Sequence, residues 1–228
     1  MTPADVSVII PTLNEAARIG RAIESARTAG AEQIIISDGG SGDETVATAS
    51  RAGALVIASP AGRGNQLRCA AEQASGRMLL FLHADNWLAA DSLRKLCACC
   101  DKVGDPQTVW GGFRQQIDSP RSIYRWIEAG NAARIRWRGM PFGDQAMFVT
   151  CHLYRQVGGF AALPLMEDVD LARRLRRVRW PLLVDAAVHV DPRRWQARGV
   201  VRQTIRNWGI QTAHFLGVSE QRLYKWYR

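Results

Sequence analysis

The sequence contains no apolar run close to the ~20 residues that a membrane-spanning helix requires. Its N-terminus has no basic-then-apolar segment of the kind that directs secretion, because strand-like sequence starts by Val6. Cysteine is scarce and odd in number, with five residues, which argues against a disulfide framework. These absences predict a cytoplasmic protein whose 228 residues, 47% of them hydrophobic, form one sizeable core.

Two common nucleotide-binding motifs are also missing. No G-x-G-x-x-G follows the first strand-like segment, which weighs against a dinucleotide-dependent dehydrogenase. Residues 62–66 (Gly-Arg-Gly-Asn-Gln) are not followed by Gly-Lys-Ser/Thr, so they do not form a P-loop. They nevertheless place backbone amides and Arg63 at the start of a helix, an arrangement that suits a diphosphate. A plain surface charge is the alternative interpretation of Arg63.

The balance of charge is basic. Thirty Lys and Arg residues against 21 Asp and Glu give a net charge of +9, and most of the excess lies beyond residue 113. Such a charge favours an anionic partner, namely nucleic acid, a phosphate-bearing substrate or an acidic membrane face, and a solvated basic surface is the alternative. Because the sequence has no aromatic-basic RNA-binding motif, we do not expect nucleic acid to be the partner.

The first hundred residues alternate between strand-like and helix-like segments. Strands are predicted at residues 6–10, 34–36, 55–57 and 78–82. The first two helices between them are predicted to start at an Asn14 cap and at a Ser41/Glu44 capping box. The third helix is predicted to carry an apolar stripe over residues 67–74. This order implies right-handed crossovers and a parallel sheet.

Beyond Asp105 the pattern is less regular. The predicted elements are a strand at 108–117, a basic helix at 121–138, a loop and short strand at 139–150, a helix at 167–179, two short strands flanking Asp185, and a helix at 200–216. We see no repeat or linker, and we therefore expect a single domain.

Polar turns follow three of the predicted strands, at residues 11–15, 37–40 and 83–86. In an open α/β sheet, ligands bind beyond the carboxyl ends of the strands, so these turns predict a site. Asp38, in the second turn, suits the base or ribose of a nucleotide, and a local capping role is the alternative. Asp85, in the third turn, suits Mg²⁺ or Mn²⁺, and capping of the next loop is again the alternative.

Three acids in four residues, Glu167, Asp168 and Asp170, begin the helix at 167–179, which ends in arginines. This distribution complements the helix dipole, so a structural explanation is available. The same cluster also suits general-base chemistry, in which one carboxylate accepts a proton while a neighbour orients it.

The order of these motifs resembles that of the family 2 glycosyltransferases, which have the GT-A fold. The resemblance covers roughly residues 5–195, and its strongest matches are Pro-Thr-Leu-Asn-Glu at 11–15 and the segment from Val157 to Leu175. It implies an α/β fold with a Rossmann-like, mostly parallel central sheet, helices on both faces and a C-terminal helical segment. It also implies a nucleotide-sugar-binding half at 1–105, an acceptor and catalytic-base half at 106–197, and a helical segment at 198–228.

The function implied by the resemblance is inverting transfer of a sugar from a nucleoside diphosphate sugar to an unidentified acceptor hydroxyl. Nucleoside contacts are implied for Pro11, Thr12, Asn14, Glu15 and Asp38. Arg63 then faces the diphosphate, Asp85 matches the second metal-binding acid, and Asp168 matches the base, with Glu167 as its neighbour. Arg179 and Trp180 echo the end of the Gln-x-x-Arg-Trp signature of processive members and are expected near the donor.

Two departures from the family pattern limit these expectations. Arg176 stands where the processive signature has Gln, which speaks against a polymer synthase. His83 stands where the family usually has the first metal-binding Asp, and imidazole suits Mn²⁺ better than Mg²⁺. Residues 62–66 together with 81–85 also resemble a soluble bacterial sub-group associated with arsenosugar biosynthesis.

Several further residues have open interpretations. Asp144 and Gln145 lie in a loop expected on the acceptor side, and Trp180 and Trp195 are candidates for stacking on an acceptor sugar, with packing as the alternative. His189 together with the segment 191–195 is a candidate for a late metal or diphosphate contact, although a structural His is the preferred interpretation. The cysteines at 97, 99 and 100 are expected to be free thiols rather than metal ligands.

The Trp-bearing basic segments 121–138 and 198–228 allow a peripheral membrane contact at the inner membrane face, and hence a lipid-linked acceptor. Docking onto the sheet is the preferred interpretation, and a homodimer contact is another. A non-catalytic nucleotide-sugar-binding protein is the alternative function, which the presence of both Asp85 and Asp168 argues against.

Overall fold

The computed structural model describes residues 1–163, 165–215, 218 and 222–223. Within them, eight strands form one sheet in the order β3-β2-β1-β4-β7-β6-β8-β5. The strands are β1 (Val6–Thr12), β2 (Gln33–Asp38), β3 (Leu55–Ala58), β4 (Met78–Phe81), β5 (Asn86–Leu88), β6 (Trp110–Ile117), β7 (Phe148–Thr150) and β8 (Leu182–Val190). β1 to β4 are mutually parallel, and β6 is parallel to β8, while β5 and β7 run antiparallel to their neighbours.

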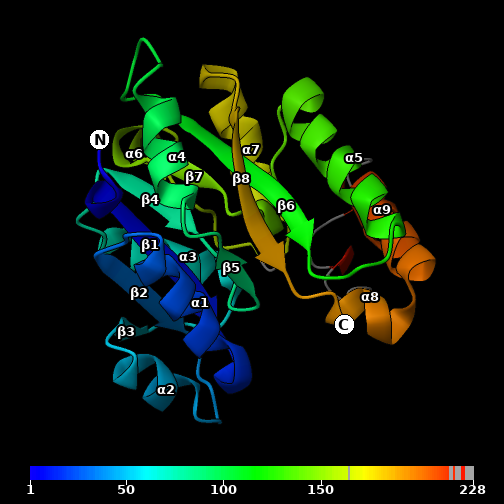
Figure 1. The fold of residues 1–228 in the computed structure, drawn as a ribbon, viewed down its shortest axis with the longest axis horizontal. Helices are drawn as coiled ribbons and strands as arrows, with labels where there is room; N and C mark the ends of the chain where they lie inside the picture. Colours follow the sequence, from blue (N-terminus) through cyan, green and yellow to red (C-terminus); the bar gives the residue numbers. More distant parts are fainter. Residues whose placement is uncertain (164, 216–217, 219–221, 224–228) are drawn as a thin grey trace.

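Helices cover both faces of this sheet (Figure 1). They are α1 (Ala16–Thr28), α2 (Thr45–Arg51), α3 (Arg63–Glu72), α4 (Ser92–Cys100), α5 (Ile123–Arg138), α6 (Cys151–Gln156), α7 (Glu167–Val178), α8 (Arg193–Arg198) and α9 (Val200–Phe215), with short 3-10 turns η1 (Pro3–Asp5) and η2 (Gly143–Gln145). α1, α2 and α4 pack on one face of the sheet, and α3, α6 and α7 pack on the other.

Alternation along β1 explains how a single strand serves both cores. Val8 and Ile10 pack with α1, and Ile9 points to the opposite side and packs with α3. All three are fully buried, which is the pattern of a strand covered on both faces. On α1, four apolar side chains that recur at helical spacing are buried, namely Ile19, Ala22, Ile23 and Ala26.

The parallel pairing brings the polar turns to one sheet edge. Thr12 at the end of β1 lies opposite Asp38 at the end of β2, and Ile9 lies opposite Phe81 at the end of β4. The turns after β1, β2 and β4 therefore share that edge, as the sequence predicted. The sheet also continues across the boundary drawn at residue 105, since β4 from the first half pairs with β7 from the second.

Several local predictions were wrong. α1 takes Glu15 rather than Asn14 as its cap residue, because Asn14 adopts the left-handed conformation, and α2 takes Glu44 rather than Ser41. The two short strands predicted around Asp185 are one strand, β8, in which Asp185 and Ala186 bulge between the pairs Phe113–Val184 and Arg114–Ala187.

The predicted C-terminal helix corresponds to α9, which ends at Phe215. In the sequence, Val201, Ile205, Trp208, Thr212 and Phe215 recur at helical spacing, and of these side chains only Thr212, which is exposed, lies within the described part. Gln203 and Ile210 are the buried side chains described on this helix.

Candidate active site

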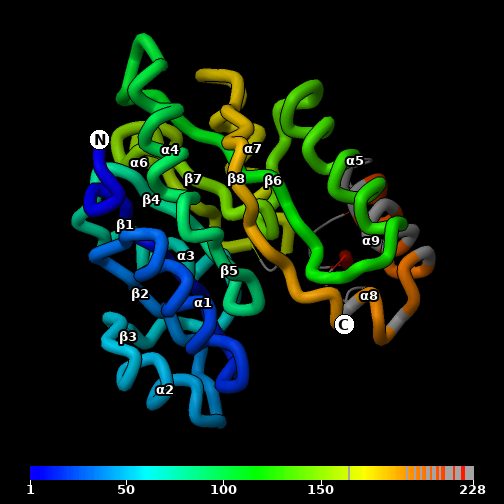
Figure 2. The backbone as a smooth tube through the Cα atoms, in the orientation of Figure 1, coloured from blue at the N-terminus to red at the C-terminus, as the bar shows by residue number. Residues whose placement is uncertain are grey.

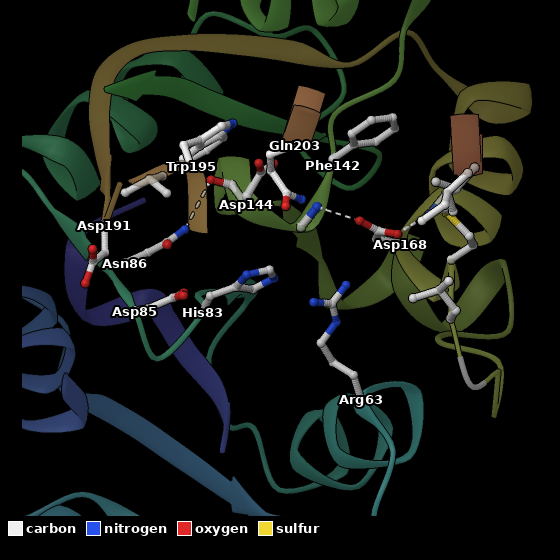
Figure 3. A pocket seen from close by; sticks show the side chains of 16 residues that line it. Arg63, His83, Asp85, Asn86, Phe142, Asp144, Asp168, Asp191, Trp195 and Gln203 are labelled. Carbon is white, nitrogen blue, oxygen red and sulfur yellow. Dashed lines mark hydrogen bonds between the residues drawn. The ribbon is translucent and has the colours of Figure 1, made fainter. Parts of the chain in front are cut away.

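A cavity of about 190 Å³ opens at the shared sheet edge (Figure 3). Its walls come from the turn after β4, from η2, from the first turn of α7, from α8 and α9, and from the start of α3. The polar and aromatic lining residues are Arg63, His83, Asp85, Asn86, Phe142, Asp144, Asp168, Asp191, Trp195 and Gln203. The structure therefore brings Asp85 and Asp168, 83 positions apart in the sequence, to one cavity.

The turn after β2 is organised by Asp38. Its Oδ1 accepts hydrogen bonds from the Thr12 and Ser41 hydroxyls at 3.1 and 2.6 Å, and its Oδ2 accepts from the Gly40 and Ser41 amides at 2.9 and 2.8 Å. Burial raises the pKa of Asp38, but these bonds outweigh it and the pKa is lowered. A carboxylate offers about four acceptor positions, so Asp38 contacts a nucleoside only if one of these bonds opens.

The turn after β1 is bonded to the same loop. The Asn14 amide donates to the Ser41 hydroxyl at 2.9 Å, and Asn14 Oδ1 accepts from the Gly42 amide at 2.9 Å. Beneath both turns, the buried Gln66 Nε2 donates to the carbonyls of Thr12 and Ser37 at 2.7 and 2.9 Å. Pro11, Thr12, Asn14 and Asp38 thus form a braced edge next to the cavity without lining it.

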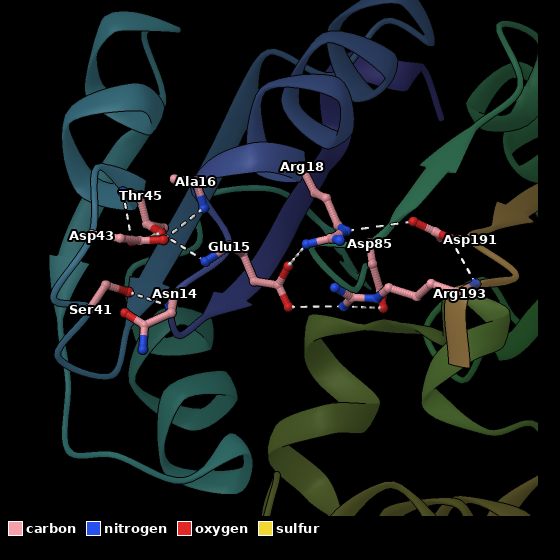
Figure 4. Close-up of polar contacts among 10 residues, drawn as sticks. All are labelled: Asn14, Glu15, Ala16, Arg18, Ser41, Asp43, Thr45, Asp85, Asp191 and Arg193. Carbon is pink, nitrogen blue, oxygen red and sulfur yellow. Dashed lines mark hydrogen bonds and ion pairs between the residues drawn. The ribbon is translucent and has the colours of Figure 1, made fainter. Parts of the chain in front are cut away.

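Arg193, at the start of α8, joins two acids of the site (Figure 4). Its guanidinium donates to Asp85 Oδ2 at 2.9 Å and to Glu15 Oε1 at 3.2 Å. Arg18 reinforces the network with contacts to Glu15 at 3.4 Å and Asp191 at 3.5 Å. Burial lowers the pKa of Arg193, but Asp85 and Glu15 outweigh that effect and raise it.

Arg63, which lines the cavity, forms an ion pair with the buried Glu167. The Arg63 Nε donates to Glu167 Oε1, and the Glu167 side chain is 1% exposed. Glu167 therefore orients Arg63. The sequence had instead suggested that Glu167 assists the base, Asp168. Arg63 itself lines the cavity, where a donor diphosphate is expected.

Asp168 lies in the first turn of α7 and is 9% exposed. Its Oδ2 accepts from the Gly143 amide at 2.7 Å, and its Oδ1 accepts from the Val169 amide at 2.8 Å. These bonds fix the carboxylate at the cavity wall with Oδ2 directed toward η2 (Figure 3). Such positioning is what a general base requires.

Gly143 has no room for a side chain. A Cβ there would lie 2.8 Å from His83 Nε2 and 3.3 Å from Asp168 Oδ2. We expect Gly143→Ala to displace one of these groups and to lower turnover at least tenfold, with a small change in melting temperature. Gly130→Ala on α5, where a Cβ meets nothing within 4 Å, is the matched control and should leave turnover unchanged. Full activity in Gly143→Ala would contradict this role.

Asp144 is directed into the cavity from η2. Its Oδ2 accepts from Gln115 Nε2 at 2.9 Å, whereas its Oδ1 is buried with no partner. Asn86, 1% exposed, donates to the Asp144 carbonyl at 3.2 Å, and its own Oδ1 is likewise buried with no partner. Burial, with a contribution from Asp168, raises the pKa of Asp144 against the lowering effect of Arg134 and Gln115. Each oxygen therefore has an unused acceptor position beside the cavity, which a water or a ligand that donates hydrogen bonds would fill.

Gln145 does not line the cavity but holds its wall. It is fully buried, and its Oε1 accepts from Arg134 at 2.7 Å and from the Phe142 amide at 3.2 Å. The Arg134 guanidinium also stacks 3.6 Å from the centre of the Phe142 ring. Burial lowers the pKa of Arg134 to about 10. Gln145 is therefore a positioning residue for Phe142, which does line the cavity.

Arg179 and Trp180 lie away from the cavity, which corrects their expected place near the donor. Arg179 donates at 3.2 Å to the Asp105 carbonyl and to the Thr108 hydroxyl, near the start of β6. Trp180 donates to the Arg136 carbonyl at 3.2 Å and is 50% exposed. Both side chains serve contacts between α7, α5 and β6, and neither enters the site proposed below.

Two other candidates have structural surroundings. His189 stacks on Trp87, with ring centres 5.6 Å apart, and burial lowers its pKa. The cysteines of α4 are free thiols, and burial raises the pKa of Cys100 to about 12. Trp195, by contrast, reaches the cavity as the acceptor interpretation expected, and so does Asp191.

The two residues that the family pattern offers to a metal, Asp85 and His83, both line the cavity. Among the described residues, no group of three or more His, Cys, Asp or Glu side chains is arranged to hold a metal ion. Mg²⁺ commonly takes only one or two carboxylates and completes its shell with water and substrate phosphates. The residues therefore fit a metal that arrives with a diphosphate, provided that Asp85 exchanges its contact with Arg193.

Comparison with known proteins identifies the family. Residues 7–163 match the family described as Glycosyl transferase family 2, and the chain belongs to that family. It is therefore a glycosyltransferase. It is 28% identical over 210 residues to a "PGL/p-HBAD biosynthesis glycosyltransferase" of Mycobacterium bovis. This alignment covers 87% of this chain and 79% of that relative.

Solved structures confirm the GT-A fold. The mannosyltransferase PcManGT of Pyrobaculum calidifontis, solved with GDP-Man and Mn²⁺, aligns with a TM-score of 0.66 at 19% identity, covering 94% of this chain and 63% of that one. S. aureus TarS 1-349, solved with UDP-GlcNAc, aligns with a TM-score of 0.64 at 15% identity, covering 84% and 58%. The chain thus spans about three fifths of these structures. The link to arsenosugar biosynthesis stays a prediction.

Proposed function

We propose that this glycosyltransferase moves a sugar from a nucleoside diphosphate sugar to an acceptor hydroxyl in one inverting displacement. The observation that carries the proposal is the joint placement of Asp85, Arg63 and Asp168 around one cavity at the carboxyl edge of the sheet. The structural neighbours solved with UDP-GlcNAc and with GDP-Man support a nucleotide-sugar donor.

In this proposal Asp168 takes the proton from the acceptor hydroxyl as its oxygen bonds to the anomeric carbon. The sugar–phosphate bond breaks on the opposite side, and the nucleoside diphosphate leaves with the bonding electron pair. Arg63 lies in the same cavity to balance the growing negative charge, and Glu167 fixes its position. The braced turns after β1 and β2, which carry Pro11, Thr12, Asn14 and Asp38, are the proposed nucleoside side.

A divalent metal, Mg²⁺ or Mn²⁺, is proposed to bind together with the donor at Asp85, with His83 as a second ligand. Neighbours solved with Mn²⁺ and UDP or GDP-Man support this assignment. When bound, such an ion supplies positive charge to the leaving diphosphate. Manganese binding is therefore expected to require nucleoside diphosphate, which titration of Mn²⁺ with and without UDP or GDP would test.

The acceptor is proposed to occupy the side of the cavity formed by Asn86, Asp144 and Trp195. The two unpartnered oxygens of Asn86 and Asp144 suit hydroxyl donors, and Trp195 and Phe142 offer aromatic faces for a sugar ring.

Asp144→Asn tests the acceptor assignment. We expect its acceptor KM to rise roughly tenfold with little change in donor affinity, because one hydrogen-bond partner is altered.

The same substitution should stabilise the fold at neutral pH. The raised pKa means that ionised Asp144 destabilises the fold above the unfolded pKa of about 3.9, so the variant should melt at a higher temperature at neutral pH and lose that advantage as the pH falls. An unchanged acceptor KM would contradict the assignment.

The decisive test of the overall proposal is a donor screen. Thermal stabilisation of the protein by nucleoside diphosphates and their sugars, with and without Mn²⁺ or Mg²⁺, should single out one base and one sugar. Release of nucleoside diphosphate from that donor would distinguish an enzyme from a non-catalytic binding protein. No stabilisation by any nucleotide would sink the proposal.

A further inference from the structure

The outer side of α5 presents large apolar side chains to solvent. Ile123, Trp126 and Trp137 are 44%, 78% and 76% exposed. At 3.6 residues per turn these positions, with Gly130, fall within an arc of about 60° along the helix. They therefore lie along one exposed ridge of α5, and α5 itself lies at the edge of the molecule, remote from β3 and α2 (Figure 2).

Trp180, just beyond α7, adds to this ridge through its contact with α5, and Val178, the last residue of α7, is a further exposed apolar side chain. Trp180 is 50% exposed and donates to the Arg136 carbonyl at 3.2 Å, and Val178 is 44% exposed. We call Ile123, Trp126, Trp137, Val178 and Trp180 the α5 surface. These are five of the eight large hydrophobic side chains that are exposed among the described residues, so the apolar exposure is concentrated here. Such a concentration marks an interaction site rather than scattered surface residues.

The exposed charge around the α5 surface is mainly positive, and the exposed acid just before α5, Asp118, lies 4.0 Å from Arg21. The exposed arginines on α5, on α7 and just before α5 are Arg121, Arg125, Arg136, Arg138, Arg176 and Arg177. The single acid within α5, Glu128, is turned inward, where it accepts from the Ile117 amide at 2.6 Å and pairs with Arg125 at 2.9 Å. An apolar ridge flanked by arginines matches the pattern of a helix that lies in a membrane interface.

The inner side of the same helix packs on the active site. Tyr124 is buried against Trp195, with ring centres 6.0 Å apart, and Arg134 stacks on Phe142. Trp195 and Phe142 both line the cavity. The fold therefore uses the inner side of α5 and leaves the outer side exposed.

We propose that the α5 surface binds an anionic phospholipid membrane. A second copy of the chain is a poorer partner, because a two-fold contact would place arginines of both copies opposite each other without an exposed acid from α5 between them. Nucleic acid matches the arginines but not the aliphatic Ile123 and Val178. Trp rings suit the headgroup level of a bilayer, and nearby arginines are attracted to its anionic lipids.

No described helix is long and apolar enough to cross a membrane, so the contact is a peripheral one. Membrane binding itself does not depend on the proposed function. If both hold, docking by α5 places the acceptor side of the cavity one helix away from the bilayer, where a sugar acceptor carried on a lipid would be presented.

Vesicle cosedimentation of the full chain tests the proposal. We expect binding to vesicles of phosphatidylcholine with phosphatidylglycerol, little binding to phosphatidylcholine alone, and release by salt. Trp126→Gln/Trp137→Gln should weaken binding at least tenfold, as should Arg136→Gln/Arg138→Gln. Leu55→Gln, at a 47% exposed site on β3, is the matched control and should bind like the parent protein.

Several outcomes would overturn the proposal. Absence of vesicle binding, or equal binding by the double-Trp variant, would do so. Light scattering that shows a dimer lost only in the double-Trp variant would assign the surface to self-association, and RNA binding lost in that variant would assign it to nucleic acid. Melting temperature and stabilisation by nucleoside diphosphate, measured in each variant, separate failure of this proposal from failure to fold or failure of the proposed function.

Discussion

Asp168→Asn is expected to abolish sugar transfer while leaving donor binding nearly unchanged. The amide cannot accept a proton from the acceptor hydroxyl, and general-base catalysis contributes on the order of 10²–10⁴ in rate. The local structure should survive, because the Asn oxygen can still accept from the Gly143 amide, a bond of 2.7 Å in the parent protein. A loss of about 10³-fold in turnover is the expected result.

The measurement is single-turnover release of nucleoside diphosphate with saturating donor and acceptor, together with thermal stabilisation by the donor. Asp170→Asn is the matched control, since Asp170 lies in the same helical turn and pairs with Arg174 at 2.6 Å on the surface of α7. It removes the same charge and should keep turnover. If Asp168→Asn turned over at the parent rate, the base would have to be another group.

The sequence was sufficient to predict how the site is brought together, for a simple reason. Apolar runs that end in polar turns at Pro11, Ser37 and His83 specify parallel strands, and parallel strands place their ends at one edge. The unpredicted parts depend on pairing partners. β5 is a three-residue strand, Asn86–Leu88, that is defined only by its pairing with β8. The bulge at Asp185 likewise exists only relative to β6.

The roles of side chains were harder to predict, because a role depends on distant contacts. Asp38 has the residue type and position expected of a nucleoside ligand, yet three bonds within its own turn and one from Thr12 use its oxygens. Arg179 matches a family signature but lies beside Thr108. Asn86 had no signal in the sequence beyond its place in the turn after β4, since its unpartnered oxygen is a property of the folded cavity.

The role of Arg193 also depends on a distant contact, namely its ion pair with Asp85. The sequence placed it in a segment that could contact a metal or diphosphate, but its pairing with Asp85 spans 108 positions. Substitution of Asp85 has the second large expected effect. Asp85→Asn should lose metal-dependent donor binding and at least about 10²-fold in turnover, because loss of one group that stabilises the leaving charge has an effect of that order. Asp185→Asn, at an 87% exposed side chain, is the control for removal of a charge.

Arg193→Gln should act on the same site in the opposite direction. Without the guanidinium, Asp85 and Glu15 lose the cation that pairs with both of them, so the site gains negative charge. A divalent cation relieves that repulsion, and the variant should bind Mn²⁺ more tightly and melt at a higher temperature when Mn²⁺ is added, an effect measured by titration calorimetry and thermal denaturation. If Arg193→Gln instead bound Mn²⁺ and donor more weakly, the guanidinium would be a direct diphosphate ligand rather than a competitor of the metal at Asp85.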